Sequence, residues 1–193
     1  GFGTNFLITQ NQIGPRIGTK GIEPYKTSQG AITNNFITDT GDHGIALSLS
    51  SNVDIGNNLI YMSTNAVHEP VYGLAFPGSV CCDAWNNLIY RTIPTLNLSN
   101  SYAMGVRFYT YNISNRFIFN TVANFQELNA VGGDSVMVAL GDQTALANSW
   151  SNVWTVFQNN LLYKGSNGFG HSAMDTWFDT GVVTNENVKY NSF

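Results

Sequence analysis

The phrase Asn57-Asn58-Leu59-Ile60-Tyr61 returns as Asn86-Asn87-Leu88-Ile89-Tyr90 and again as Asn159-Asn160-Leu161-Leu162-Tyr163. Weaker copies begin at Thr4, Asn34 and Asn115. Counted at the second position of each copy (5, 35, 58, 87, 116 and 160), the steps are 30, 23, 29, 29 and 44 residues. Four of the five steps match one turn of a solenoid, and the fifth predicts a long loop or a degenerate extra rung around residues 141–151.

A second phrase recurs between these copies, with apolar side chains at alternate positions: Gly44-Ile45-Ala46-Leu47, Gly73-Leu74-Ala75-Phe76, Gly105-Val106-Arg107-Phe108 and Val136-Met137-Val138-Ala139-Leu140. An apolar residue at every second position predicts short strands rather than helices. In the stretch from 51 to 58, Val53 and Ile55 are therefore expected inward and Asp54 outward. Asn tolerates the left-handed turn conformation, and stacked Asn side chains can hydrogen-bond from rung to rung.

These patterns predict an all-β fold, a right-handed parallel β-helix of about six to seven rungs. We expect a single domain over 1–193, a segment of a longer chain or of an assembly, because both ends fall in the middle of a rung. Leu59, Leu88 and Leu161 are predicted to stack along one interior column. No single rung buries its apolar face alone, so successive rungs have to share one continuous core.

Charge is scarce in this sequence. Only 10% of the residues are charged and the net charge is −4, which provides no basic patch for a phosphate backbone. No apolar run approaches the roughly 20 residues that a membrane-spanning helix needs. We therefore expect neither nucleic acid nor membrane as a partner, and no cofactor. The adjacent Cys81 and Cys82 should point to opposite faces, one thiol buried and one exposed, with an interchain disulfide as the alternative.

The stretch from Thr38 to Leu47, followed by Ser51 to Asn58, resembles the pectin-lyase-like β-helix superfamily of polysaccharide-active enzymes and phage tailspikes. The resemblance implies a carbohydrate ligand, and trimers where a member belongs to a phage particle. Asp42 matches the first aspartate of the Gly-Asp-Asp phrase of polygalacturonase-type hydrolases, and His43 replaces the second. Gly170-His171-Ser172 only partly matches their Gly-His-Gly phrase, and the calcium, lysine and arginine set of pectate lyases is not recognisable. The resemblance is therefore one of fold.

Asp39, Asp42 and His43 form the densest titratable group of the sequence and are the candidate catalytic residues. Two carboxylates near a histidine would serve as acid and base in glycoside cleavage. In a lyase, His43 would abstract a proton alpha to a uronate carboxyl. The alternative is that the stretch 41–44 is simply a polar turn between strands.

Substrate-binding residues are expected on the outward faces of the rungs. Asp54 and Asp83 occupy equivalent places in successive rungs, either as a carboxylate pair or cation site, or as two solvated acids. Tyr61 and Tyr90 share a rung position. With Trp85 they would offer rings on which sugars stack, unless they stack as part of the core. The other aromatic residues available for this role are Tyr72, Trp150, Trp154 and Trp177.

Two other places with histidine carry less chemistry. His68 and Glu69 lie in a predicted loop and match no metal motif, and His171 is expected to be structural. We therefore expect no metal site.

Three functions remain open at this point. In the first, the chain binds a surface polysaccharide and, in one version, also cleaves it, as a tailspike or as a hydrolase or lyase does. In the second, its rungs stack end to end into extracellular filaments. In the third, it is a non-catalytic adhesin or receptor-binding module. All three place it outside the cell or on a virion surface. Sister chains are expected partners, in a trimer or an axial stack.

Overall fold

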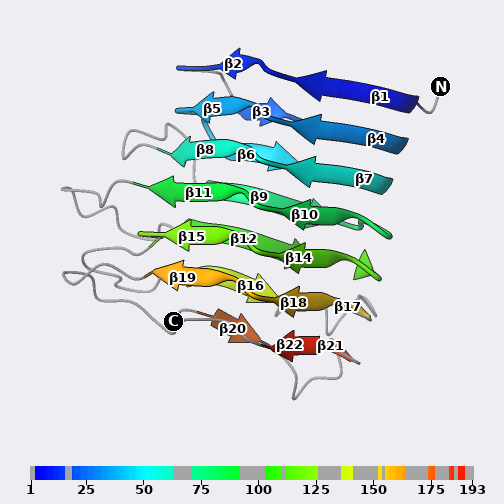
Figure 1. Cartoon of the computed structure of the whole chain (residues 1–193), viewed down its shortest axis with the longest axis vertical. Helices are drawn as coiled ribbons and strands as arrows, with labels where there is room; N and C mark the ends of the chain where they lie inside the picture. The colour runs from blue at the N-terminus through cyan, green and yellow to red at the C-terminus, as the bar shows by residue number, and fades with distance from the viewer. Residues whose placement is uncertain are drawn as a thin grey trace.

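The computed structural model covers the 193-residue chain and describes residues 3–15, 19–62, 71–91, 103–109, 112–125, 136–140, 152–153, 155–163, 174–176, 183–184 and 187–189. These residues wind into a column of parallel coils with the N-terminus at one end and the last strands at the other (Figure 1). In the described part of the chain, no helix is long and apolar enough to cross a membrane.

Three parallel sheets run along the column. Each of the first six coils contributes one strand to each sheet, and the last coil adds β22 to the first. The first sheet stacks β1 (Thr4–Thr9), β4 (Ser28–Thr33), β7 (Ser51–Gly56), β10 (Asp83–Trp85), β14 (Arg116–Ile118), β18 (Val156–Gln158) and β22 (Asn187–Lys189). The second stacks β2 (Gln12–Ile13), β5 (Phe36–Thr38), β8 (Leu59–Met62), β11 (Leu88–Arg91), β15 (Thr121–Ala123) and β19 (Leu161–Tyr163). The third stacks β3 (Lys20–Ile22), β6 (His43–Ala46), β9 (Val71–Pro77), β12 (Ala103–Tyr109), β16 (Val136–Leu140) and β20 (Met174–Thr176).

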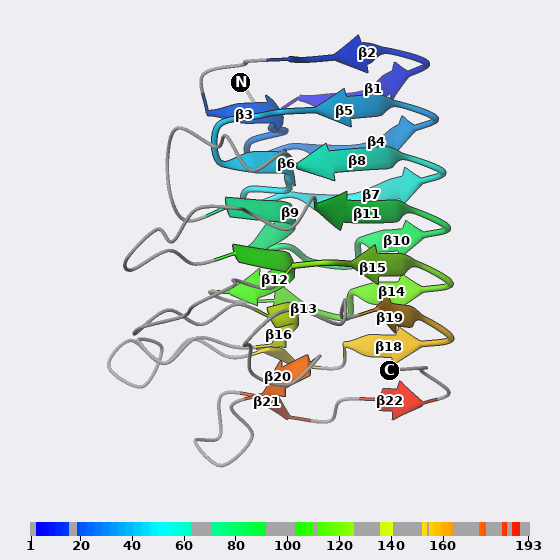
Figure 2. The same ribbon diagram turned by 90° about the vertical axis from the view of Figure 1, so that its left-hand side faces the viewer.

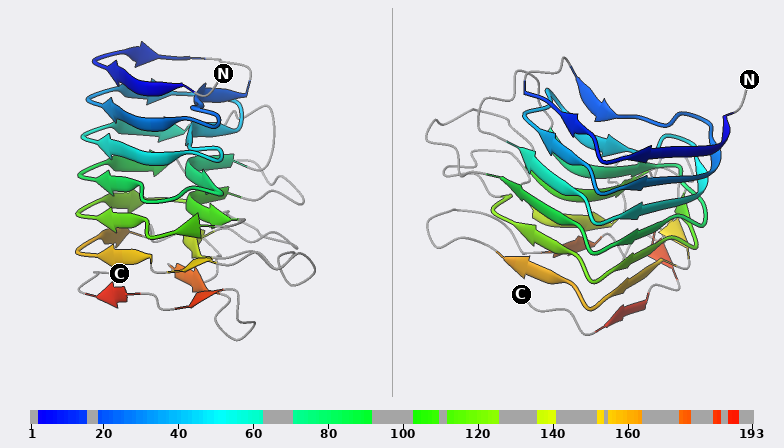
Figure 3. Two further views of the ribbon diagram at one scale, coloured as in Figure 1. Left: turned by 90° about the vertical axis from the view of Figure 1, so that its right-hand side faces the viewer. Right: turned by 45° about the horizontal axis from the view of Figure 1, so that its top comes forward.

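A short fourth sheet of β13 (Asn112–Ile113), β17 (Asn152–Val153) and β21 (Val183–Thr184) leads into the first. Figure 3 shows the resulting column from its other side and from above. Seven strands in the first sheet and six in each of the next two confirm the predicted parallel β-helix of six to seven rungs.

A ladder of asparagines forms the tight turn between the first and second sheets. Its members are Asn11, Asn35, Asn58, Asn87, Asn120 and Asn160. The backbone N–H and Nδ2 of each asparagine donate to Oδ1 of the next, at 2.8–3.2 Å. The residue before each ladder position has a φ of 52–57°, the left-handed conformation that turns the chain. Both roles predicted for the Asn pairs are confirmed.

The ladder corrects two of the weak sequence copies. The predicted alignment used Asn5 and Arg116, but both lie in the first sheet, and Arg116 pairs with Asp83. The true ladder members are Asn11 and Asn120, which follow Gln10 and Phe119 instead of a first asparagine. The ladder steps become 24, 23, 29, 33 and 40 residues. Direct pairing of β15 with β19 leaves no extra rung between those two strands.

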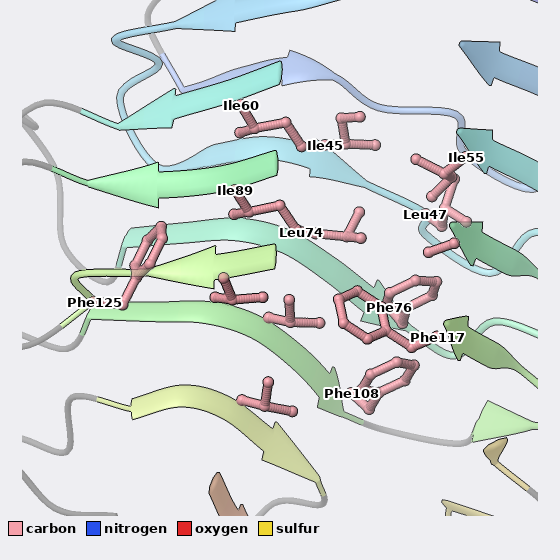
Figure 4. Packing of buried hydrophobic residues seen from close by; sticks show 14 of the residues in the cluster. Ile45, Leu47, Ile55, Ile60, Leu74, Phe76, Ile89, Phe108, Phe117 and Phe125 are labelled. Carbon is pink, nitrogen blue, oxygen red and sulfur yellow. The ribbon is translucent and has the colours of Figure 1, made fainter. Parts of the chain in front are cut away.

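The interior is filled by apolar columns that run through the rungs. Ile37, Ile60, Ile89, Val122 and Leu162 pair in succession along the second sheet, and each is buried. Between the third and first sheets, phenylalanine rings stack rung on rung, with centroids 4.4 Å apart for Phe76 and Phe108 (Figure 4).

The prediction for the leucine column was wrong about its face. Leu59, Leu88 and Leu161 lie in one column, joined through Thr121, but Leu88 is 41% and Leu161 47% exposed. The repeated phrase thus has the right register, whereas its second apolar residue, Ile89, rather than Leu88, points inward.

Other predicted placements are confirmed. Val53 and Ile55 are buried and Asp54 is exposed. Cys82 is buried and Cys81 exposed, and the two thiols do not bridge each other. The interchain disulfide stays an alternative.

Candidate functional site

The predicted site residues do not form one site, because the fold distributes them over three outward faces. Asp42 and His43 belong to the third sheet, Tyr61 and Tyr90 to the second, and Asp54, Asp83 and Trp85 to the first. Each face therefore presents its own set of side chains, and the three sets differ in their chemistry.

The third sheet, whose strands stack one above the other in Figure 2, carries the densest group of ionisable residues. One column of Cα partners runs Lys20, His43, Tyr72 and Met104. The next outward column runs Ala46, Ala75, Arg107 and Ala139, and Glu23 follows β3 at the same level. Tyr72, Met104 and the three alanines form a small apolar cluster that is separate from the interior core. Small residues thus form the floor of this face, and ionisable groups lie on it.

His43 is the central ionisable group of the face. Its side chain is 9% exposed and that of Asp42 is 23% exposed, and Oδ1 of Asp42 lies in contact with Nδ1 of His43. The other ring nitrogen, Nε2, is buried and has no hydrogen-bond partner among the described residues. A carboxylate beside Nδ1 favours the tautomer with the proton on that nitrogen, which leaves a lone pair on Nε2.

Burial lowers the pKa of His43 to about 4, and the positive charges of Lys20 and Arg107 act in the same direction while Glu23 opposes them. At neutral pH the imidazole is therefore uncharged and able to accept a proton. A free base within a buried site is a property that proton abstraction requires.

Tyr72 and Arg107 lie beside this base. The rings of His43 and Tyr72 have centroids 4.7 Å apart. Nη1 of Arg107 donates to Oη of Tyr72, and the guanidinium lies 4.6 Å from the ring centroid of Tyr109. The site thus combines a neutral imidazole, a carboxylate, a phenol and a guanidinium.

Asp39 has a backbone role. It has a φ of 49°, and its N–H donates to the carbonyl of Tyr61 at the corner between the second and third sheets. The contact at this site joins a single carboxylate, Asp42, to His43. Glycoside hydrolysis needs two carboxylates across the scissile bond, so the arrangement fits proton abstraction by His43 better.

On the first sheet, Asp54 and Asp83 are Cα partners, as predicted. The next residue of the column is Arg116, whose Nη1 lies 3.0 Å from Oδ2 of Asp83. Partial burial raises the pKa of Asp83, Arg116 lowers it and Asp54 raises it. Arg116 thus supplies the cation for this pair, and the described residues contain no group of three or more His, Cys, Asp or Glu able to hold a metal ion.

The aromatic candidates stack on the protein itself. Tyr61 and Tyr90 are Cα partners with ring centroids 4.8 Å apart and planes inclined by 31°. Trp85 lies over Gly56, where an added Cβ would come within 2.4 Å of the indole. Sugar stacking by these three residues remains a prediction.

Some predicted residues lie outside the part of the chain that the structure describes. They are His68, Glu69, Trp150, Trp154, Trp177 and His171.

Sequence reasoning counted Tyr72 only among the aromatic residues for sugar stacking, and it missed Arg107 and Lys20. The signal for the first two of these residues was present in the second repeated phrase, because Tyr72 precedes Gly73 as His43 precedes Gly44. Arg107 stands where the earlier copies have Ala46 and Ala75. Aligning these phrases by column would have brought all three side chains to one face.

No protein-family model matches the chain, and no curated protein matches its sequence. Among solved structures, the periplasmic alginate epimerase AlgG superimposes with a TM-score of 0.66 at 14% identity, covering 96% of this chain and 38% of that one. The A-module of the mannuronan C-5 epimerase AlgE6 from Azotobacter vinelandii gives 0.53 at 13% identity, covering 97% of this chain and 51% of that one. The chain therefore spans about half or less of either structure, and such identities establish fold alone. This chain has a right-handed parallel β-helix fold, which it shares with these two structures.

Proposed function

We propose that this chain acts on an acidic polysaccharide and removes the proton next to the carboxylate of a uronate sugar, as a lyase or an epimerase. The observation that carries this proposal is the neutral His43 imidazole, with its free Nε2, beside the Tyr72–Arg107 pair. By their names, the two epimerases act on alginate and on mannuronan, and they share only the fold with this chain.

The first step takes the proton from C5 of the sugar. Nε2 of His43 accepts it, and the electron pair of the C–H bond moves into the adjacent carboxylate. Arg107 stabilises the negative charge that develops there, as a fixed cation in a partly buried site does effectively. Asp42 holds the imidazole in the tautomer that accepts at Nε2.

The second step decides the product. In a lyase the electron pair forms a C4=C5 double bond, the C4–O bond breaks, and the leaving oxygen takes a proton from Tyr72. In an epimerase C5 takes a proton from water on the opposite face of the ring, because His43 and Tyr72 lie on the same side of the sugar, and no bond between sugars breaks. Arg107 beside Oη favours the negative charge left on the phenol oxygen.

The test is to incubate the protein with alginate and with polygalacturonate. A lyase gives products with a C4=C5 bond that absorb in the ultraviolet, and an epimerase incorporates deuterium at C5 from heavy water, seen by NMR. His43→Gln should lower either rate by roughly 100-fold or more, the usual contribution of a general base. Asp42→Asn should also lower the rate, by about tenfold or more.

Matched controls come from the other two faces. Asp54→Asn repeats the Asp42 change on the first sheet. Tyr61→Phe is the second-sheet control for Tyr72→Phe, which should lower the rate of a lyase because it removes the proton donor. Both controls should keep the wild-type kcat, because neither residue contacts the reacting atoms at His43. The proposal fails if His43→Gln is as active as the wild type, or if neither polymer is changed.

This function places the chain outside the cell or on a virion surface, where such polymers are found. Association with sister chains stays a prediction.

A further inference from the structure

We infer that Lys20 is a second anion-binding position of this site, beside Arg107, and that Glu23 occupies it in the free protein. Lys20 would select polymers with a negative charge on the sugar next to the reacting one. This inference rests on the proposed function, because it takes the sugar bound at His43 as the reference.

The position of Lys20 is set by the strand register. Lys20 is the Cα partner of His43 on the neighbouring strand, and adjacent strands are spaced by roughly 4.8 Å. This spacing is comparable to the length of one sugar unit in an extended polysaccharide. A polymer that follows the column would therefore place the next sugar at Lys20 when one sugar lies at His43.

Lys20 already holds a carboxylate in the free protein. Its Nζ lies 2.5 Å from Oε1 of Glu23, and the same oxygen accepts a hydrogen bond from Oγ of Ser48 at 2.7 Å. Partial burial alone would raise the pKa of Glu23, but the hydrogen bonds from Lys20 and Ser48 outweigh it and hold the pKa below its ordinary value. Glu23 is thus ionised at neutral pH, and its carboxylate shows the geometry in which Lys20 binds an anion.

The pair is accessible for exchange. Both side chains are 30% exposed, so a carboxylate of the substrate can reach Lys20 and replace Glu23. Ser48 keeps a hydrogen bond to Glu23 after the exchange, which reduces the cost of releasing it. A neutral sugar offers no such exchange and leaves the ion pair in place.

The charges near His43 predict whether each substitution strengthens or weakens polymer binding. Among the residues that the structure describes, Lys20 and Arg107 are the cations near His43, and Glu23 and Asp42 the anions. Removing Lys20 takes away a binding cation, whereas neutralising Glu23 removes its competitor. Lys20→Met should therefore weaken binding of a polyanion and Glu23→Gln should tighten it.

The experiment measures binding of alginate and of polygalacturonate by calorimetry, with dextran as the neutral polymer. Lys20→Met should raise the Kd about tenfold and Glu23→Gln should lower it severalfold, a tenfold change being about 1.4 kcal/mol. Lys26→Met is the matched control, because Lys26 is exposed, lies over Tyr25 and loses the same charge. Its Kd should stay within about twofold of the wild type. Dextran should show no dependence on any of these changes.

Turnover separates this inference from the proposed function. Because Lys20 does not contact the reacting atoms, Lys20→Met should raise KM while leaving kcat nearly unchanged. If the polymer is turned over but Lys20→Met and Lys26→Met behave alike, or Glu23→Gln weakens binding, the inference is wrong and the chemistry stands. If no polymer is turned over but Lys20→Met selectively weakens binding, the chemistry is wrong and the anion-binding position stands.

Discussion

Two outward faces of the same solenoid differ in what they carry. The second sheet presents two outward columns in which no described residue is charged: Gln12, Phe36, Leu59, Leu88, Thr121 and Leu161, then Thr38, Tyr61, Tyr90, Ala123 and Tyr163. The third sheet, with the same parallel backbone and the same core behind it, presents Lys20, His43, Tyr72 and Arg107. Stacking requires apolar side chains inside and a suitable turn residue at each corner, and it leaves the outward positions free to vary.

The largest effect is expected on folding stability. It shows whether the outward side chains of the second sheet contribute to the core. Ile89→Ala should cost on the order of 2–5 kcal/mol of unfolding free energy, because Ile89 is fully buried in the central column. Leu88→Ala, one residue earlier on the same strand, should cost less than about 1 kcal/mol. Urea denaturation of both variants measures the difference. Equal costs would mean that the leucine column is covered in solution.

The next largest effect is a loss of folding stability at low pH, caused by the buried His43 of the third sheet. The pKa of His43 is about 4 in the folded chain against an ordinary 6.5, so the unfolded chain binds its proton first as the pH falls. The wild type should therefore lose on the order of 3 kcal/mol between pH 6.5 and pH 4, with no contribution from this group above that window.

His43→Gln lacks this group, so its stability should fall less over the same window. Urea midpoints at several pH values measure the difference between the two proteins, and titrating groups away from this site, such as Asp83, cancel in it. Parallel pH curves would show that His43 is solvated and would weaken its assignment as a free base.

Much of this fold could be predicted from its sequence, because the core and the turn both repeat. Asn58 and Asn87 follow one another with the same neighbours, so the rung period could be counted directly. The face of Leu88 could not be decided, since Leu88 and Ile89 are both apolar and period-two alternation fits either choice. The site was harder still. Arg107 lies 64 residues from His43 in sequence (107 minus 43), and only the column register brings it near.

The smallest effect is expected for Tyr61 and Tyr90 of the second sheet. It distinguishes a structural role of these rings from a role in sugar binding. Tyr61 and Tyr90 are half-buried and stack with centroids 4.8 Å apart, so their ring faces are turned toward each other rather than to solvent. A double-mutant cycle with Tyr61→Ala and Tyr90→Ala should give a coupling of about 0.5–1.5 kcal/mol in unfolding free energy, as for other aromatic pairs. Binding of alginate and polygalacturonate should be unchanged in both variants, since the two ring faces that meet in this pair are closed to a sugar. Ala123 follows Tyr90 in the column and leaves the other face of that ring without an aromatic neighbour. If Tyr90→Ala weakens polymer binding while Tyr61→Ala does not, this open face binds sugar, and the contrast between an uncharged structural face and a chemical face would no longer hold.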